Sequence, residues 1–136
     1  MDYTIAAADA YLTLPARKEG IIPGAANLRL PRFVGDRIAR QAVLSELRID
    51  CASPQGKMVC DEIISSNDMD NAIKRVVENL TSSGIVSAAG NRRAFRAGEE
   101  PLDAFRRYMA VYAREQAHCH LSPALVANLE KNWKVK

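Results

Sequence analysis

The strand-forming residues of this chain all lie in its first half, and this placement constrains the fold more than any other feature. Apolar residues alternate with polar or small ones over residues 3–7 and 12–14, which is the two-residue period of β-strands. A further short strand is predicted over residues 59–64. A half-apolar strand needs a hydrogen-bonded neighbour and a covering layer. The pattern therefore predicts an α+β or α/β fold with few short strands and an incomplete sheet, followed by a helical tail.

The rest of the sequence has helical periodicity. Apolar residues three or four positions apart predict helices over residues 36–47 and 66–84, and Pro101 is placed to open a third. Small residues between positions 88 and 98 predict a flexible connector. A last helix is predicted from large side chains four positions apart, a stripe typical of a core or a subunit interface: Leu121, Leu125, Leu129 and Trp133.

The composition is that of one ordinary globular domain. The chain has 136 residues, of which 48% are hydrophobic and 26% are charged. The net charge is +3 and the basic residues are spread along the chain, so we expect no nucleic-acid partner, while the phosphates of a small ligand remain compatible. No segment is long and apolar enough to span a membrane, and no signal-peptide pattern opens the sequence. We therefore expect no membrane association.

The cysteines predict neither a disulfide framework nor a metal site. Cys51, Cys60 and Cys119 are odd in number and widely spaced, which is typical of reduced thiols in a cytoplasmic protein. His118 and His120 flank Cys119, but neighbouring residues on a helix point about 100° apart and cannot close on one ion. We expect no resident metal.

The segment "PARKEGIIPGAANLRLPR", residues 15–32, allows two interpretations. Pro23 and Gly24 signal a turn, and a glycine is used where the backbone is tight or approaches another group closely. The segment is either a plain loop that joins a strand to a helix, or a loop whose backbone faces a ligand.

Residues 9–44, which contain this segment, resemble the middle of the crotonase (enoyl-CoA hydratase/isomerase) superfamily of acyl-CoA enzymes. In that family a strand leads to a proline, a Gly-x-x-Pro-Gly segment and a Leu-Pro-Arg-x-x-Gly helix junction. These elements are Pro15, residues 20–24 and residues 30–35 here. Residues 47–64 match the family's next helix and strand without gaps. The resemblance thus favours the second interpretation, a loop that lines an acyl pocket.

The resemblance implies the C-terminal half of a crotonase fold, a ClpP-like ββα spiral. It assigns a partial crotonase core to residues 1–64 and a helical C-terminal oligomerisation region to residues 65–136. The intact family forms trimers or dimers of trimers, so a homo-oligomer is expected.

The sequence of residues 12–30 is most similar to that of the cofactor-independent dioxygenases that act on dihydroxyphenylacetyl-CoA in glycopeptide-antibiotic biosynthesis. Hydratases of the superfamily carry a glutamate after the proline as general base for water, whereas this chain has Ala16. The resemblance implies stabilisation of a thioester enolate by two backbone N–H donors, with molecular oxygen as co-substrate, coenzyme A as part of the substrate, and no metal or flavin.

Both oxyanion donors of the family lie before the strand with which this sequence starts. We therefore expect the chain to be inactive alone, to need a separately made N-terminal half, and to leave the catalytic residues unassigned. The resemblance offers substrate-binding candidates in Arg17, Glu19, Pro23, Gly24 and Asn27, and candidates for the CoA phosphates in Arg92, Arg93 and Arg96.

Three possibilities stay open at this point. The chain is either a part of such a dioxygenase, a non-catalytic oligomerising or CoA-binding module, or a part of an enzyme with another hydratase- or isomerase-type activity. Two residues depart from the family pattern: Glu46 replaces a turn glycine, and Met58 replaces a glycine or leucine. If the turn needs a positive φ, Glu46 destabilises the fold by about 1 kcal/mol or more.

Overall fold

The computed structural model describes residues 2–82 and 84–132. Within these residues the strands all lie in the first half of the chain, and the second half is helical. In chain order the elements are β1 (Ile5–Ala7), β2 (Tyr11–Leu12), α1 (Ala16–Glu19), α2 (Ala26–Arg29), α3 (Pro31–Leu44), β3 (Ile49–Asp50), η1 (Gly56–Met58), β4 (Glu62–Ile64), η2 (Ser66–Asp68), α4 (Met69–Thr81), α5 (Ile85–Glu99), α6 (Leu102–His120) and α7 (Pro123–Asn132).

The strands form two sheets of two strands each. β1 pairs in parallel with β4, so that Ile5 lies opposite Glu62, while β2 pairs antiparallel with β3. The predicted third strand begins only at Glu62, because the 3₁₀ helix η1 comes first. A side chain at Gly56 would lie 2.3 Å from the Asp50 carbonyl oxygen, so only glycine allows this close turn.

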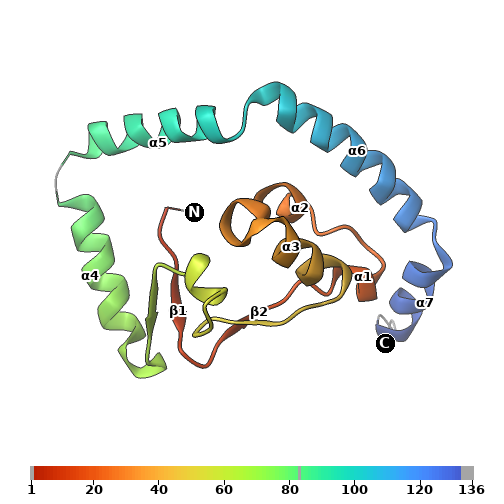
Figure 1. Cartoon of the computed structure of the whole chain (residues 1–136), viewed down its shortest axis with the longest axis horizontal. Coiled ribbons are helices and arrows are strands. Elements are labelled where there is room, and N and C mark those ends of the chain that lie inside the picture. Colours follow the sequence, from red (N-terminus) through yellow and green to blue (C-terminus); the bar gives the residue numbers. More distant parts are fainter. Residues whose placement is uncertain (1, 83, 133–136) are drawn as a thin grey trace.

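The helices α4 to α7 form an arc around the strands and around α1, α2 and α3 (Figure 1). α4 contacts β1 and buries Ala72 and Val76, and α7 contacts α1 and buries Leu125. Between them, α5 and α6 bury no residue. The arc is therefore packed on the rest of the chain mainly at its two ends.

One predicted connector and the bounds of two predicted helices differ from the structure. The predicted connector over 88–98 lies inside α5, because its alanines and arginines favour helix by more than its glycines oppose it, at about 1 kcal/mol per glycine. The helix predicted over 36–47 starts at Pro31, breaks at Gly35 and ends at Leu44.

The predicted last helix begins only after Leu121, the first residue of its stripe. α6 ends at His120, and Pro123 opens α7 where its missing N–H costs nothing. Leu121 is exposed between the two helices, and Trp133 lies outside the described residues.

The core is built largely from small side chains. Six of the ten buried hydrophobic residues are alanine or cysteine, and Val34, Ile49, Val76 and Leu125 are the rest. The accessible surface is 10071 Å², against roughly 7,000 Å² for a compact protein of this mass. The chain thus leaves much apolar surface open.

Candidate functional site

A cavity of about 1250 Å³ lies between the β2 segment, α2 and α3, the 57–61 turn and the end of α5. Its volume exceeds the roughly 300–1,000 Å³ of most small-molecule pockets. Its walls are mainly apolar and include Leu12, Leu14, Leu30, Phe33 and Leu47. A large ligand or a polypeptide segment can therefore be accommodated.

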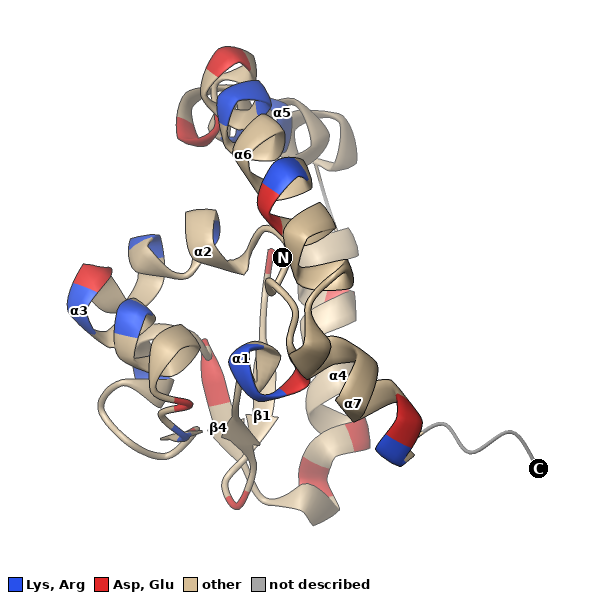
Figure 2. Cartoon of the chain, turned by 90° about the vertical axis from the view of Figure 1, so that its right-hand side faces the viewer, with Lys and Arg blue, Asp and Glu red and all other residues tan. Residues whose placement is uncertain are grey.

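Charged residues of both signs border the cavity. Arg29, Arg32, Arg96 and Lys57 supply cations, and the acidic residues are Asp2, Asp61, Glu99 and Glu100. Lys and Arg are spread over several elements of the chain (Figure 2). The cavity is thus locally charged without forming part of a broad basic face.

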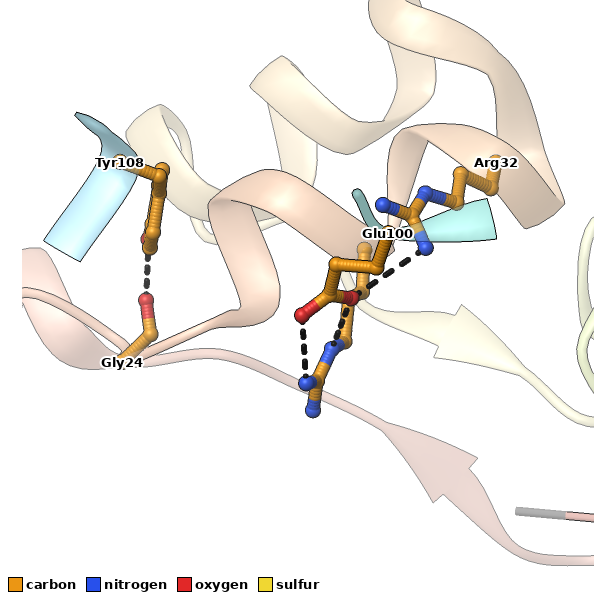
Figure 3. Close-up of polar contacts among 5 residues, drawn as sticks. Gly24, Arg32, Glu100 and Tyr108 are labelled. Atoms are coloured by element: carbon orange, nitrogen blue, oxygen red, sulfur yellow. Dashed lines mark hydrogen bonds and ion pairs between the residues drawn. The ribbon is translucent and has the colours of Figure 1, made fainter. Parts of the chain in front are cut away.

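Glu100 links the α5–α6 junction to the opposite wall of the cavity. Its carboxylate accepts two hydrogen bonds of 2.9 Å from Arg29 and one of 3.3 Å from Arg32 (Figure 3). The hydrogen bond from Arg29 is the largest influence that lowers the pKa of Glu100 below its ordinary value. At neutral pH this carboxylate is charged and joins α2 and α3 to the helical arc.

The turn at Pro23 and Gly24 is held by α6. The side-chain oxygen of Gln116 accepts a hydrogen bond of 2.9 Å from the Ile22 N–H. The hydroxyl of Tyr108 donates to the carbonyl oxygen of Gly24 (Figure 3). Burial, and secondarily Tyr112, raise the pKa of Tyr108, so its hydroxyl keeps its proton at neutral pH.

The substrate-binding candidates from the sequence do not line the cavity. Arg17 donates 2.8 Å to the carbonyl oxygen of Leu44 at the end of α3. Glu19 is exposed at the end of α1 and Asn27 is exposed on α2, while Pro23 and Gly24 form the turn that α6 holds. The segment 15–32 is also more helical than a loop, since it contains α1, α2 and the start of α3. The roles of these five residues stay a prediction.

The three arginines proposed for the CoA phosphates have different surroundings. Arg96 borders the cavity. Arg92 donates 2.8 Å to Asp2, and Arg93 is exposed on α5. Of the three, Arg96 is the one placed to meet a ligand in the cavity.

The pair Arg29 and Arg32 was missed in the sequence, although both belong to the quoted Leu-Arg-Leu-Pro-Arg run. Their partner Glu100 lies 71 and 68 positions further along the chain, and no local pattern signals such a distant pairing. No sequence pattern pointed to Lys57, which also borders the cavity.

The turn residue Glu46 has φ of 56°, the only positive φ of a non-glycine residue in the described part of the chain. The predicted departure from a glycine position is thereby confirmed as a strained one. Met58, the other departure, is exposed and borders the cavity.

The cysteines and histidines lie apart from the charged cavity rim, except for Cys60. Cys51 and Cys60 are buried, and burial raises the pKa of the Cys60 thiol to about 11. Within residues 2–82 and 84–132 there is no group of three or more His, Cys, Asp or Glu side chains suited to a metal ion. In the same residues no helix has the length and apolar character that crossing a membrane requires.

The chain is similar in sequence to proteins that are named for acyl-CoA substrates. No family model matches the chain. Over 85% of its length it is 46% identical to a (3,5-dihydroxyphenyl)acetyl-CoA 1,2-dioxygenase from Amycolatopsis orientalis, and it covers 26% of that protein. Over 79% of its length it is 24% identical to a carnitinyl-CoA dehydratase from Salmonella paratyphi B, of which it covers 42%.

A solved structure agrees with the observed arrangement. An enoyl-CoA hydratase from Mycobacterium avium subsp. paratuberculosis superposes with a TM-score of 0.81 and 22% identity, over 91% of this chain and 50% of that chain. The chain spans between about a quarter and a half of the length of these proteins.

Proposed function

The chain has a partial crotonase fold and is related to crotonase-superfamily acyl-CoA enzymes, as its sequence predicted, and from this premise we propose that it is the C-terminal part of a dihydroxyphenylacetyl-CoA dioxygenase. The observation that carries the proposal is the 46% identity to the dioxygenase from Amycolatopsis orientalis. The chain would supply one wall of the acyl-CoA site and would be inactive without the remainder.

The residue after Pro15 supports oxygenation over hydration. Ala16 is buried at the start of α1, and its methyl group cannot take a proton from water. A carboxylate at this position is what a hydratase of the superfamily would use as general base. The chemistry left to the site is the stabilisation of a thioester enolate, which reacts with molecular oxygen after the α-carbon has lost a proton.

The enolate oxygen needs two backbone N–H donors aimed at it. By the resemblance, we assign these donors to polypeptide that precedes the first strand in the family. The cavity supports this assignment, because its volume of about 1250 Å³ leaves room for both the thioester and a polypeptide segment. We further propose that the reaction uses no resident metal or flavin and that coenzyme A enters only with the substrate.

Complementation tests this proposal. The chain is mixed with the part of the Amycolatopsis orientalis dioxygenase that it does not match, and oxygen and (3,5-dihydroxyphenyl)acetyl-CoA are followed together. We expect the mixture to consume both in equal amounts, each part alone to consume neither, and a chelator to leave the rate unchanged. Crotonyl-CoA serves as the control substrate. Hydration of crotonyl-CoA by the mixture, or binding of the two parts without consumption of oxygen, would contradict the proposal.

A second candidate function is a non-catalytic oligomerising or CoA-binding module. It is supported by α5, which buries no residue and exposes Ile85, Val86 and Phe95. We propose a trimer or a dimer of trimers as its assembly, and the cytoplasm as its location because the cysteines are free thiols.

Size-exclusion chromatography with light scattering separates the two candidates. A stable, monodisperse oligomer of the isolated chain favours the module. Aggregation through the edge of β1 that does not face β4 favours the part of an enzyme, because an open strand edge pairs with other chains.

A further inference from the structure

The backbone turn before α2 is fastened on both sides by one helix. Residues 22–24 form a three-residue turn in which the Gly24 N–H donates 2.8 Å to the carbonyl oxygen of Ile22. Gln116 of α6 accepts from the N–H that enters this turn, and Tyr108 of α6 donates to the carbonyl that leaves it (Figure 3). The turn is thus held at its first donor and its last acceptor.

Neither backbone group has another partner within the described residues. The hydrogen bonds of this part of the chain include no second acceptor for the Ile22 N–H and no second donor for the Gly24 carbonyl. Both bonds are partly buried. An unsatisfied, partly buried backbone group is unfavourable, so loss of either side chain would drive the turn to rearrange.

α7 contacts the beginning of the same segment, at residues 19 and 20. Asn128 donates 3.1 Å to the carbonyl oxygen of Glu19. A side chain at Gly20 would lie 3.1 Å from the backbone of Leu125, which shows how closely α7 approaches the segment. The contacts of α6 are therefore made on a segment whose beginning is already fixed.

The turn at residues 22–24 also fixes the position of α2, which lines one wall of the cavity. The Ala26 N–H, at the start of α2, donates 3.1 Å to the carbonyl oxygen of Pro23. α2 then contributes Ala26 and Arg29 to the cavity, and Leu30 follows directly. A shift of residues 22–24 would consequently move these three lining residues.

We propose that Gln116 and Tyr108 are positioning residues of the acyl-CoA site, which set the place of α2 through the turn at residues 22–24. The consequence for the site rests on the proposed function; the fixing of the turn does not. The C-terminal helices then act on the pocket of their own chain in addition to any contacts between subunits. His120, whose ring lies 2.9 Å from the side-chain nitrogen of Gln116, holds the amide in its orientation.

Four variants of the full chain test the proposal by amide hydrogen exchange in solution. Q116L removes the acceptor, and we expect exchange at Ile22 to become about tenfold faster, the effect of one lost hydrogen bond. Q116E keeps an acceptor oxygen and should restore protection. Y108F should loosen residues 24–26, while Y112F is the matched control, because Tyr112 stacks on Tyr108 at 6.4 Å and no hydrogen bond of its hydroxyl is recorded in the described chain.

Ligand binding is measured on the same variants with (3,5-dihydroxyphenyl)acetyl-CoA as the probe. We expect Q116L and Y108F to weaken binding several-fold, with Q116E and Y112F close to the parent chain, and all four to unfold at similar urea concentrations. Where the parent chain, mixed with the complementary part of the Amycolatopsis orientalis dioxygenase, does not bind the probe either, the proposed function fails while the exchange data still decide the inference. Unchanged exchange at Ile22 in Q116L, or equal effects of Y108F and Y112F, would overturn the inference.

Discussion

Residues 2–64 and residues 69–132 are held in place in different ways. The first region is joined by strand pairs and by buried side chains such as Val34, Ala39 and Ile49. In the second region α5 and α6 bury nothing, and α6 is attached through polar side chains that reach the backbone of residues 22–24. The first region holds most of the buried core, and α5 and α6 of the second region are tethered to it by polar contacts.

The difference shows where this chain leaves apolar surface uncovered. A helix gains most of its stability from packing an apolar face, and short helices without such packing are marginal in water. Val86 is 86% exposed and Phe95 is 69% exposed on α5. α5 therefore leaves apolar surface uncovered, while the polar contacts of α6 hold the segment beside the cavity.

The strongest test of this comparison removes one of the apolar contacts that join the two regions. Leu125 of α7 is buried against Gly20. We expect L125A to lower the free energy of unfolding by about 2–4 kcal/mol, through lost burial and the cavity left behind. Urea unfolding followed by circular dichroism measures the change.

Leu121→Ala is the matched control, because Leu121 is 84% exposed between α6 and α7. Its effect should stay within about 0.5 kcal/mol. Equal losses for the two variants would mean that α7 is not packed on α1.

The next test concerns the contribution of the helical region to the cavity. Arg96 borders the cavity and Arg93 does not. We expect R96A to weaken binding of (3,5-dihydroxyphenyl)acetyl-CoA about tenfold, the effect of one charge-assisted hydrogen bond to a phosphate. R93A should leave the dissociation constant nearly unchanged in the same titration. A reversed order would place the CoA phosphates elsewhere on α5.

Local sequence patterns predicted the secondary-structure elements that are determined by neighbouring residues. The alternation over residues 3–7 indicated β1, and the apolar spacing after residue 66 indicated α4, because both patterns report which side of an element is covered. The motif residues around Pro15 and Leu30 indicated the fold. The strained turn was also foreseen, because Glu46 stands where the resembled family has a turn glycine.

The site was harder to predict because its contacts join distant residues. Tyr108 meets Gly24 across 84 positions, and Gln116 meets Ile22 across 94 positions. Neither a polar side chain on a helix nor a turn carries a local signal for such a contact. Arg17 and Glu19 were predicted for the pocket from their place in the motif; Arg17 instead donates to the Leu44 carbonyl oxygen and Glu19 is exposed, and their roles in binding stay a prediction.

A third test should stabilise residues 2–64 through a substitution outside the helices. Glu46 has φ of 56°, a conformation that glycine adopts without strain. We expect E46G to raise the free energy of unfolding by about 1 kcal/mol. Glu78→Gly, in the exposed interior of α4, is a control of opposite sign and should destabilise by about 1 kcal/mol. Destabilisation by both variants would mean that the Glu46 side chain makes compensating contacts.

The smallest expected effect lies at the charged link between the regions. Glu100 pairs with Arg29 and Arg32, whose side chains are partly exposed, so E100Q should destabilise by at most about 1 kcal/mol at pH 7. The folded-state pKa of Glu100 is lowered, so its contribution is present above its unfolded pKa and is lost as the pH falls through the folded value. The difference between the parent chain and E100Q in urea unfolding should therefore shrink as the pH falls from 7 to below about 4. Asp103→Asn is the control, because Asp103 is exposed and lies 4.0 Å from Arg106. A constant difference across this pH range would mean that Glu100 stabilises the link through packing and not through its charge.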